Sequence, residues 1–258
     1  MSNGAATDQA DDQTRPASHV EALRFVHRRL QPRTYVEIGV GRGRTLAIAP
    51  PHTQVIGIDP FPDLRRSLSE HNRLFTVPSD TFFDLWDLEE LFGGRKVDLA
   101  FIDGLHLFEY ALRDFINVER ACAPGSVVLL HDCYPIDAET AARVRTTGRW
   151  TGDVWKLILC LKKYRPDLQI DVADVPKSGL GIVQGLDPES TTLTERRRDI
   201  VREFVPMKAD VLDEGKDETL NRVPGDWDTL GSVIPLAPFV RGSMVRRLRG
   251  AASTKLHR

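Results

Sequence analysis

The sequence of 258 residues lacks the cysteine pattern of a disulfide framework or a zinc site, because Cys122, Cys133 and Cys160 show no C-x-x-C spacing. It also lacks any segment near the ~20 apolar residues that a membrane-spanning helix needs. Residues 1–12 are polar and acidic, and they contain no apolar core of a signal peptide. We therefore expect a protein of a reducing, cytoplasmic compartment that does not enter a membrane.

A strong net charge is missing as well. The chain carries 35 Lys and Arg against 37 Asp and Glu, which gives a net charge of −2. A nearly neutral surface offers little attraction to a phosphate backbone, so we expect no nucleic-acid partner. The exception is the segment 241–258, which is basic and has no acidic residue.

Short apolar runs alternate with amphipathic stretches along most of the chain. Strands are predicted at 34–38, 54–58, 74–77, 97–102, 126–130, 169–172 and 181–183, and helices at 20–30, 44–50, 63–71, 82–92, 107–122, 154–164 and 194–204. This alternation predicts an α/β fold with a Rossmann-like, doubly wound and mostly parallel sheet that ends in a C-terminal antiparallel strand pair. We expect disorder at 1–16, a folded domain at 17–186, and a helical and loop extension with a basic tail at 187–258.

The most informative segment is residues 37–45 (EIGVGRGRT), where glycine occupies alternate positions directly after the first predicted strand. Positions without a side chain let backbone N–H groups approach a ligand closely. Asp59 follows the next strand, where a carboxylate can accept hydrogen bonds from a ribose diol. The dinucleotide fingerprint G-x-G-x-x-G would need glycine at Arg44. The pattern E-x-G-x-G-x-G instead resembles motif I of class I S-adenosylmethionine (SAM) methyltransferases; without a ligand, it would be an ordinary tight turn.

Polar side chains also follow the next three predicted strands. Ser79 and Asp80 come after the third strand, Asp103 after the fourth, and His131 and Asp132 after the fifth. Because ligands of doubly wound sheets bind beyond the carboxyl ends of the strands, these residues are candidates for one site.

Two further segments resemble the signatures of one group of small-molecule O-methyltransferases. Residues 98–110 (DLAFIDGLHLFEY) resemble F-I-D-G-x-H-x-Y-E, and residues 125–132 (GSVVLLHD) resemble G-G-x-x-x-x-H-D. The group includes the macrolide-sugar (macrocin, mycinamicin) enzymes and bacterial saccharide-tailoring relatives, and the resemblance covers about residues 33–185. It implies methyl transfer from SAM to a hydroxyl of a small-molecule or oligosaccharide acceptor, with the methylmannose polysaccharide of mycobacteria as one candidate. It also implies a homo-oligomer in which the basic tail takes part in subunit contacts.

The resemblance implies a set of cofactor-binding positions. Glu37 would help to orient the amino group of SAM, and Ser79 and Asp80 would contact the adenine. The full set expected to bind SAM is Glu37, Ile38, Gly39, Gly41, Gly43, Thr45, Asp59, Ser79, Asp80 and Asp103. Capping of the following helix is the alternative role for Ser79 and Asp80.

A sugar hydroxyl is a poor nucleophile at neutral pH, so its methylation needs a base or a metal ion. In the resembling metal-dependent enzymes, the ligand positions match Asp103, His131 and Asp132. Oxygen ligands favour Mg²⁺, whereas imidazole suits Mn²⁺, Fe²⁺ or Zn²⁺ better, and His131 stands where the macrolide-sugar enzymes carry a carboxylate. Either Asp103 and Asp132 hold Mg²⁺ with water, or His131 faces the substrate and the metal is weak or absent.

His106 lies three residues beyond Asp103, and its imidazole titrates near neutral pH. We expect His106 to act as the general base, with Asp103 as its catalytic neighbour. A helix cap or a substrate hydrogen bond is the alternative for His106, and a contact to the SAM amino group is the alternative for Asp103.

Two other functions fit the same segments less well. A catechol- or phenol-type O-methyltransferase would usually carry asparagine where Cys133 follows Asp132. A SAM-binding partner subunit without catalysis would not need the intact set Asp103, His106 and Asp132.

Overall fold

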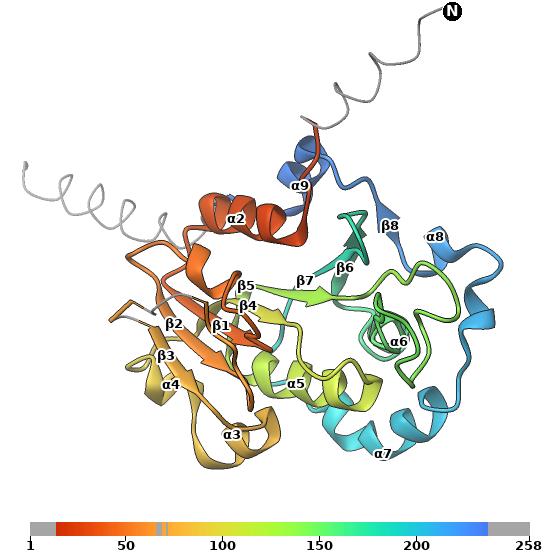
Figure 1. Cartoon of the computed structure of the whole chain (residues 1–258). Coiled ribbons are helices and arrows are strands. Elements are labelled where there is room, and N and C mark those ends of the chain that lie inside the picture. The colour runs from red at the N-terminus through yellow and green to blue at the C-terminus, as the bar shows by residue number, and fades with distance from the viewer. Residues whose placement is uncertain (1–13, 66–68, 71, 237–258) are drawn as a thin grey trace, which may run out of the picture.

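The computed structural model describes residues 14–65, 69–70 and 72–236. These residues form an α/β fold around an eight-stranded sheet (Figure 1). Its strands are β1 (Thr34–Ile38), β2 (Gln54–Ile58), β3 (Asn72–Phe75), β4 (Val97–Ile102), β5 (Cys122–His131), β6 (Gln169–Ala173), β7 (Leu180–Gln184) and β8 (Arg222–Val223).

The strand order is β3-β2-β1-β4-β5-β7-β6-β8. All neighbouring pairs are parallel except those of β7, which runs antiparallel to both β5 and β6. The predicted doubly wound, mostly parallel sheet with an antiparallel pair is therefore confirmed. Because β1, β2, β4 and β5 are parallel, their carboxyl ends meet at one edge of the sheet, where such folds bind ligands.

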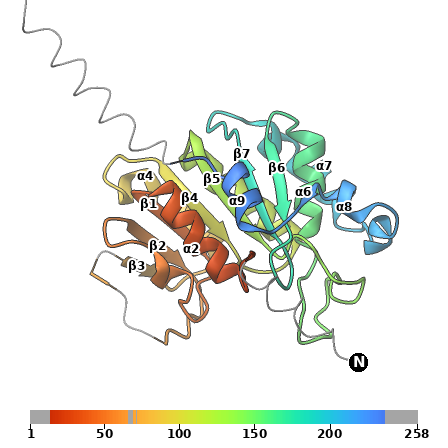
Figure 2. The same ribbon diagram turned by 90° about the horizontal axis from the view of Figure 1, so that it is seen from above.

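Helices cover both faces of the sheet (Figure 1). Figure 2, turned to look from above, shows α2 and α9 lying in front of the strands. On that face are α2 (His19–Leu30), η1 (Leu46–Ile48) and α9 (Trp227–Val233), and on the other are α3 (Ser79–Leu85), α4 (Leu88–Leu91), α5 (Phe108–Ala121), α6 (Trp155–Tyr164) and α7 (Thr192–Phe204). Between α7 and β8 lie η2 (Ala209–Leu212) and α8 (Lys216–Thr219).

The two helical layers explain why the central strands are almost uniformly apolar. Successive side chains of a strand point to opposite faces. In β4, Ala100 and Ile102 join the core beneath α5, whereas Leu99 and Phe101 join the core beneath α2. A strand that is buried on both faces has no polar alternation, which is typical of parallel sheets.

Two predicted helices differ in the structure. The helix expected at 44–50 is only the 3₁₀ turn η1, because Pro50 and Pro51 stop the chain before a second turn can form. The helix expected at 82–92 is split into α3 and α4, because Asp87 adopts an extended conformation and its side chain accepts a hydrogen bond from the Glu90 N–H. Such N-capping starts a new helix.

The start of α3 and the segment before β3 also differ from expectation. Pro78 occupies the N-cap position of α3, and no side-chain cap bond is present, so the capping alternative for Ser79 and Asp80 is wrong. Residues 63–65 are not helical, and part of the helix expected at 63–71 lies outside the described residues.

The C-terminal residues are integrated with the sheet. The helix α7 packs on the α5 layer, β8 pairs with β6, and α9 covers the same face as α2. The division into 17–186 and 187–258 stays a prediction. Residues 1–13 and the basic tail from 241 lie outside the described residues. Within the described part of the chain, no helix combines the length and apolar character needed to cross a bilayer.

A buried ion pair ties α5 to the end of α6. Arg165 Nη1 lies 2.8 and 2.7 Å from the two carboxylate oxygens of Glu119, and both side chains are at most 5% exposed. Arg165 also pairs with Asp167, whose side chain is 53% exposed.

We predict that Glu119→Gln lowers the free energy of unfolding by about 3 kcal/mol, because the guanidinium stays buried after losing a charged partner. Asp167→Asn is the matched control and is expected to cost less than about 1 kcal/mol, because exposed ion pairs contribute little. Urea denaturation measures both changes. Equal losses of unfolding free energy in the two variants would contradict the claim that burial makes the Glu119–Arg165 pair more stabilising than the exposed Asp167–Arg165 pair.

Candidate active site

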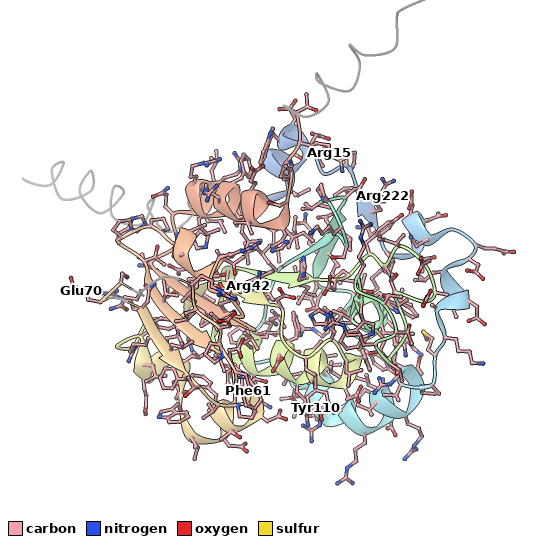
Figure 3. All side chains as sticks on the ribbon, in the orientation of Figure 1. Arg15, Arg42, Phe61, Glu70, Tyr110 and Arg222 are labelled. Carbon is pink, nitrogen blue, oxygen red and sulfur yellow. The ribbon has the colours of Figure 1, made fainter. Side chains whose placement is uncertain are left out.

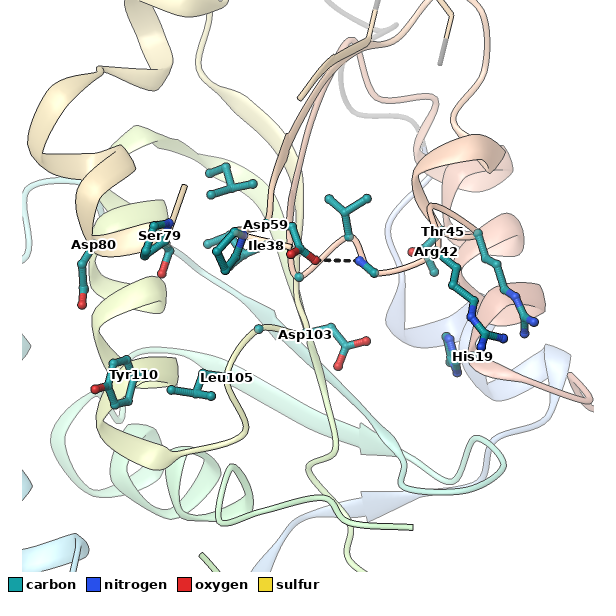
Figure 4. Close-up of a pocket in the computed structure, with 18 residues that line it drawn as sticks. His19, Ile38, Arg42, Thr45, Asp59, Ser79, Asp80, Asp103, Leu105 and Tyr110 are labelled. Atoms are coloured by element: carbon teal, nitrogen blue, oxygen red, sulfur yellow. Dashed lines mark hydrogen bonds between the residues drawn. The ribbon is translucent and has the colours of Figure 1, made fainter. Parts of the chain in front are cut away.

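A cavity of about 550 Å³ lies over the carboxyl ends of β1, β2 and β4 (Figure 4). In Figure 3, Arg42 lies toward α2 and Tyr110 toward α5, so the cavity extends across the strand ends. The predicted cofactor residues that line it are Ile38, Gly39, Gly41, Thr45, Asp59, Ser79, Asp80 and Asp103. Glu37 and Gly43 do not line it.

The glycine turn packs directly against the loop that follows β4. Gly39 has a φ of +87°, and a Cβ atom at this position would lie 1.9 Å from the carbonyl oxygen of Asp103. The Asp103 N–H donates to the carbonyl of Ile38 at 2.8 Å. Only glycine permits this conformation and this approach.

Asp59 holds the turn from the side of β2. One carboxylate oxygen accepts a hydrogen bond from the Gly41 N–H at 2.7 Å, drawn as a dashed line in Figure 4. The other oxygen accepts from the Phe61 N–H at 2.7 Å. Each carboxylate oxygen has a further lone pair, and Asp59 lines the cavity, so it can still accept from a ribose diol.

Glu37 is fully buried beneath the turn. Its two oxygens accept hydrogen bonds from the hydroxyls of Tyr35 at 2.7 Å and Thr45 at 2.6 Å. Burial, with a smaller contribution from the charges of Asp103 and Asp59, raises the pKa of Glu37 to about 8 against these two hydrogen bonds. In this structure Glu37 supports Thr45 from below the cavity, and its contact with the amino group of SAM stays a prediction.

The opposite end of the cavity is formed by α3 and α5. Ser79 and Asp80 stand at the start of α3, and Asp80 pairs with Arg113 at 2.8 Å. Leu105 and Tyr110 lie across from them (Figure 4). The prediction missed Leu105, although its place three residues after the end of β4 would have indicated it.

A cluster of two carboxylates and two imidazoles lies beside the cavity. His131 Nδ1 is 3.0 Å from Asp103 Oδ1 and 3.3 Å from Asp132 Oδ1. His106 Nδ1 is 3.0 Å from Asp132 Oδ2, and His106 Nε2 is 3.5 Å from Asp103 Oδ1. The structure therefore brings together all four predicted catalytic and metal-binding residues, and Asp103 belongs to both the cluster and the cavity wall.

Contacts within the cluster shift the pKa values of Asp103, His131 and His106. Burial alone would raise the pKa of Asp103, but the charge of His131 and hydrogen bonds from His106 and His131 lower it. Burial alone would lower the pKa of His131, but Asp103 and Asp132 raise it well above its ordinary value. The pKa of His106 is also raised, since the carboxylates of Asp103 and Asp132 outweigh its burial.

The segment 150–153 fixes the loop that carries His106. The Trp150 ring stacks on the His106 ring, with centroids 5.3 Å apart and planes inclined by 18°. Gly152 has a φ of +61°, and a Cβ atom there would lie 1.7 Å from the carbonyl oxygen of His106. Asp153, which is buried, accepts from the Phe108 N–H at 2.8 Å and so caps α5. Sequence reasoning assigned no role to Trp150, because the contact joins segments more than 40 residues apart.

The cluster fits a divalent metal ion by its donor set. Asp103, His131 and Asp132 each offer one ligand atom, and these atoms lie within 4.8 Å of one another. Two carboxylates with one imidazole suit Mn²⁺ better than Mg²⁺. His131 Nε2 is buried without a hydrogen-bond partner among the described residues. In this structure Nδ1 of His131 lies 3.0 and 3.3 Å from the two carboxylates and bridges them.

Comparison with known proteins agrees with this geometry. Residues 36–133, less than half of the chain, match the family model described as a methyltransferase domain. No curated protein matches the chain. The cofactor-bound structure of Rv0187 from MTB is 16% identical and has a TM-score of 0.51, over 71% of this chain and 88% of that chain. The fold is therefore the Rossmann-like fold of class I methyltransferases.

Two further solved structures have TM-scores below 0.5. A putative O-methyltransferase from Klebsiella pneumoniae is 15% identical with a TM-score of 0.47, over 72% of this chain and 84% of that chain. The O-methyltransferase TomG from Streptomyces achromogenes, solved in complex with SAM, is 15% identical with a TM-score of 0.48, over 66% and 80%.

The buried Glu37 predicts a distinct pH dependence of stability. An acid with a higher pKa in the folded than in the unfolded state binds its proton more tightly when folded. Its contribution to stability is present below about pH 4.5 and is lost as the pH rises toward about 8. Relative to Glu37→Gln, the wild-type protein should lose stability between pH 5 and 7.5, by at most about 1.4 kcal/mol per pH unit. Denaturant unfolding without ligand measures the difference. Parallel pH profiles for the two proteins would contradict the assignment.

Proposed function

We propose that this protein is a SAM-dependent O-methyltransferase that acts on a hydroxyl of a sugar or a glycosylated metabolite. The observation that carries the proposal is the shared position of Asp103. This residue lines the cavity formed by the glycine turn and Asp59, and it also contacts both imidazoles of the cluster. A methyl donor in the cavity and a proton acceptor in the cluster would thus lie side by side.

The cavity residues would bind the cofactor along the strand ends. Asp59 would accept the hydrogen bonds of the ribose, and Gly39 and Gly41 would allow the methionine portion to approach the backbone. Ser79 and Leu105 would flank the adenine at the α3 end. This arrangement would direct the sulfonium methyl group toward Asp103 and the cluster.

The cluster residues would then remove the proton of the acceptor. With Nδ1–H of His106 directed to Asp132, Nε2 carries the lone pair that accepts the hydroxyl proton. The hydroxyl oxygen forms a bond to the methyl carbon, the carbon–sulfur bond breaks, and S-adenosylhomocysteine leaves as a neutral thioether. The carboxylates of Asp103 and Asp132 stabilise the imidazolium that results.

A metal ion fits the same proposal. Asp103, His131 and Asp132 would hold it, and when bound it would lower the pKa of the acceptor hydroxyl. The sugar acceptor is supported by the resemblance of residues 98–110 and 125–132 to the macrolide-sugar group. A phenolic acceptor remains the competing substrate class.

We predict that Asp59→Asn weakens S-adenosylhomocysteine binding at least tenfold, because the ribose loses a charged acceptor and Gly41 loses its tether. His106→Gln should leave this affinity within about twofold and lower methyl transfer at least 100-fold. Calorimetry measures binding, and tritiated SAM with a panel of saccharides and catechols measures transfer. The exposed His52→Gln is the control. Loss of S-adenosylhomocysteine binding in His106→Gln would show that His106 serves the cofactor and is not the base.

We predict that the wild-type protein binds one Mn²⁺ ion and that Asp132→Asn binds it at least tenfold more weakly, because one of two carboxylate ligands is lost. Electron paramagnetic resonance of free Mn²⁺ measures this without an acceptor. Equal binding by both proteins would remove Asp132 from the ligand set, and full methyl transfer in EDTA would remove the metal from the reaction.

A further inference from the structure

The end of the cavity that faces α2 is basic. His19, Arg42 and Arg44 line it, and in Figure 4 His19 and Arg42 lie on the opposite side of Asp103 from Ser79 and Asp80. We call this part of the cavity the basic end. The two arginines belong to the glycine turn, whereas His19 is the first residue of α2. Segments distant in the sequence therefore form this wall together.

The charges of the two arginines are poorly compensated. Arg42 Nε lies 4.0 Å from Asp63 Oδ2, and both side chains are more than half exposed. Asp63 pairs more closely with Arg65, at 2.7 Å. Among the described residues, no ion pair or side-chain hydrogen bond engages Arg44. Two guanidinium groups at a cavity wall thus keep most of their hydrogen-bond donors available.

The groups next to His19 belong to the cluster. The ring of His131 contacts that of His19, with centroids 4.4 Å apart. The nearby acids, Asp103 and Asp132, are already engaged by imidazoles. The basic end therefore carries positive charge that no described acid neutralises closely.

We propose that the basic end binds a carboxylate or phosphate group of the acceptor, so that the substrate class is an anionic saccharide or another anionic hydroxyl compound. This inference rests on the proposed function. Planar guanidinium groups bind carboxylate and phosphate through paired hydrogen bonds, which would fix the orientation of the acceptor. The carboxylate of SAM itself is the other source of an anion. A single carboxylate needs only one guanidinium, whereas the basic end offers two, those of Arg42 and Arg44.

The first measurement separates the two sources of the anion. The variant carrying Arg42→Gln and Arg44→Gln is titrated with S-adenosylhomocysteine and with 5′-methylthioadenosine, which lacks the amino-acid portion. Arg65→Gln is the control, because this exposed arginine pairs with Asp63 beside Arg42 but does not line the cavity. We expect all affinities within about twofold of wild type. A tenfold loss for S-adenosylhomocysteine alone would assign the arginines to the cofactor carboxylate and overturn an acceptor subsite.

The second measurement tests the anion directly. Protein saturated with S-adenosylhomocysteine is titrated with inorganic phosphate and with D-glucuronate at constant ionic strength, followed by nuclear magnetic resonance. We expect the double variant to bind either probe at least tenfold more weakly than wild type, and Arg65→Gln to match wild type. Equal binding by wild type and the double variant would overturn the proposal. If S-adenosylhomocysteine does not bind wild type at all, the proposed function fails instead, and phosphate titration of the free protein still tests the basic end.

Discussion

The close contact between Gly39 and the carbonyl of Asp103 is the constraint on which the rest of the site depends. It brings the turn after β1 against the loop after β4 with no space for a side chain between them. Asp59 holds the same turn from β2 by accepting from Gly41. The cavity is thus built from backbone that three parallel strands position, and any wider separation of β1 and β4 would move Asp103 away from either the cavity or the cluster.

The electrostatic balance of the cluster is the second feature on which the proposed methyl transfer depends. In this structure Nδ1 of His131 holds the carboxylates of Asp103 and Asp132 together, at 3.0 and 3.3 Å. A divalent cation could take over that role with the same ligands. His106 is stabilised as an imidazolium by both carboxylates, which is the property that a proton acceptor needs.

Apolar runs predicted the central strands well, because strands buried on both faces cannot be polar, and the rule of carboxyl strand ends then located Asp59 and Asp103. Contacts between distant segments were not predictable from local pattern. The strand β8 has only two residues and forms because β6 offers a free edge. The stacking of Trp150 on His106 and the approach of His19 to His131 depend on tertiary packing, so neither leaves a signal in the spacing of the sequence.

The central proposal is that a methyl group passes from SAM in the cavity to an oxygen beside the cluster. Incubation of the protein with SAM labelled with ¹³C at the methyl group, together with a mixture of neutral and anionic saccharides, tests it most directly. We expect a new ¹³C methyl-ether resonance in the saccharide fraction and an equal amount of S-adenosylhomocysteine. Label on a nitrogen or carbon atom of the acceptor would contradict the proposal. So would a folded protein that forms no S-adenosylhomocysteine and tightly binds another nucleotide, such as NAD, instead.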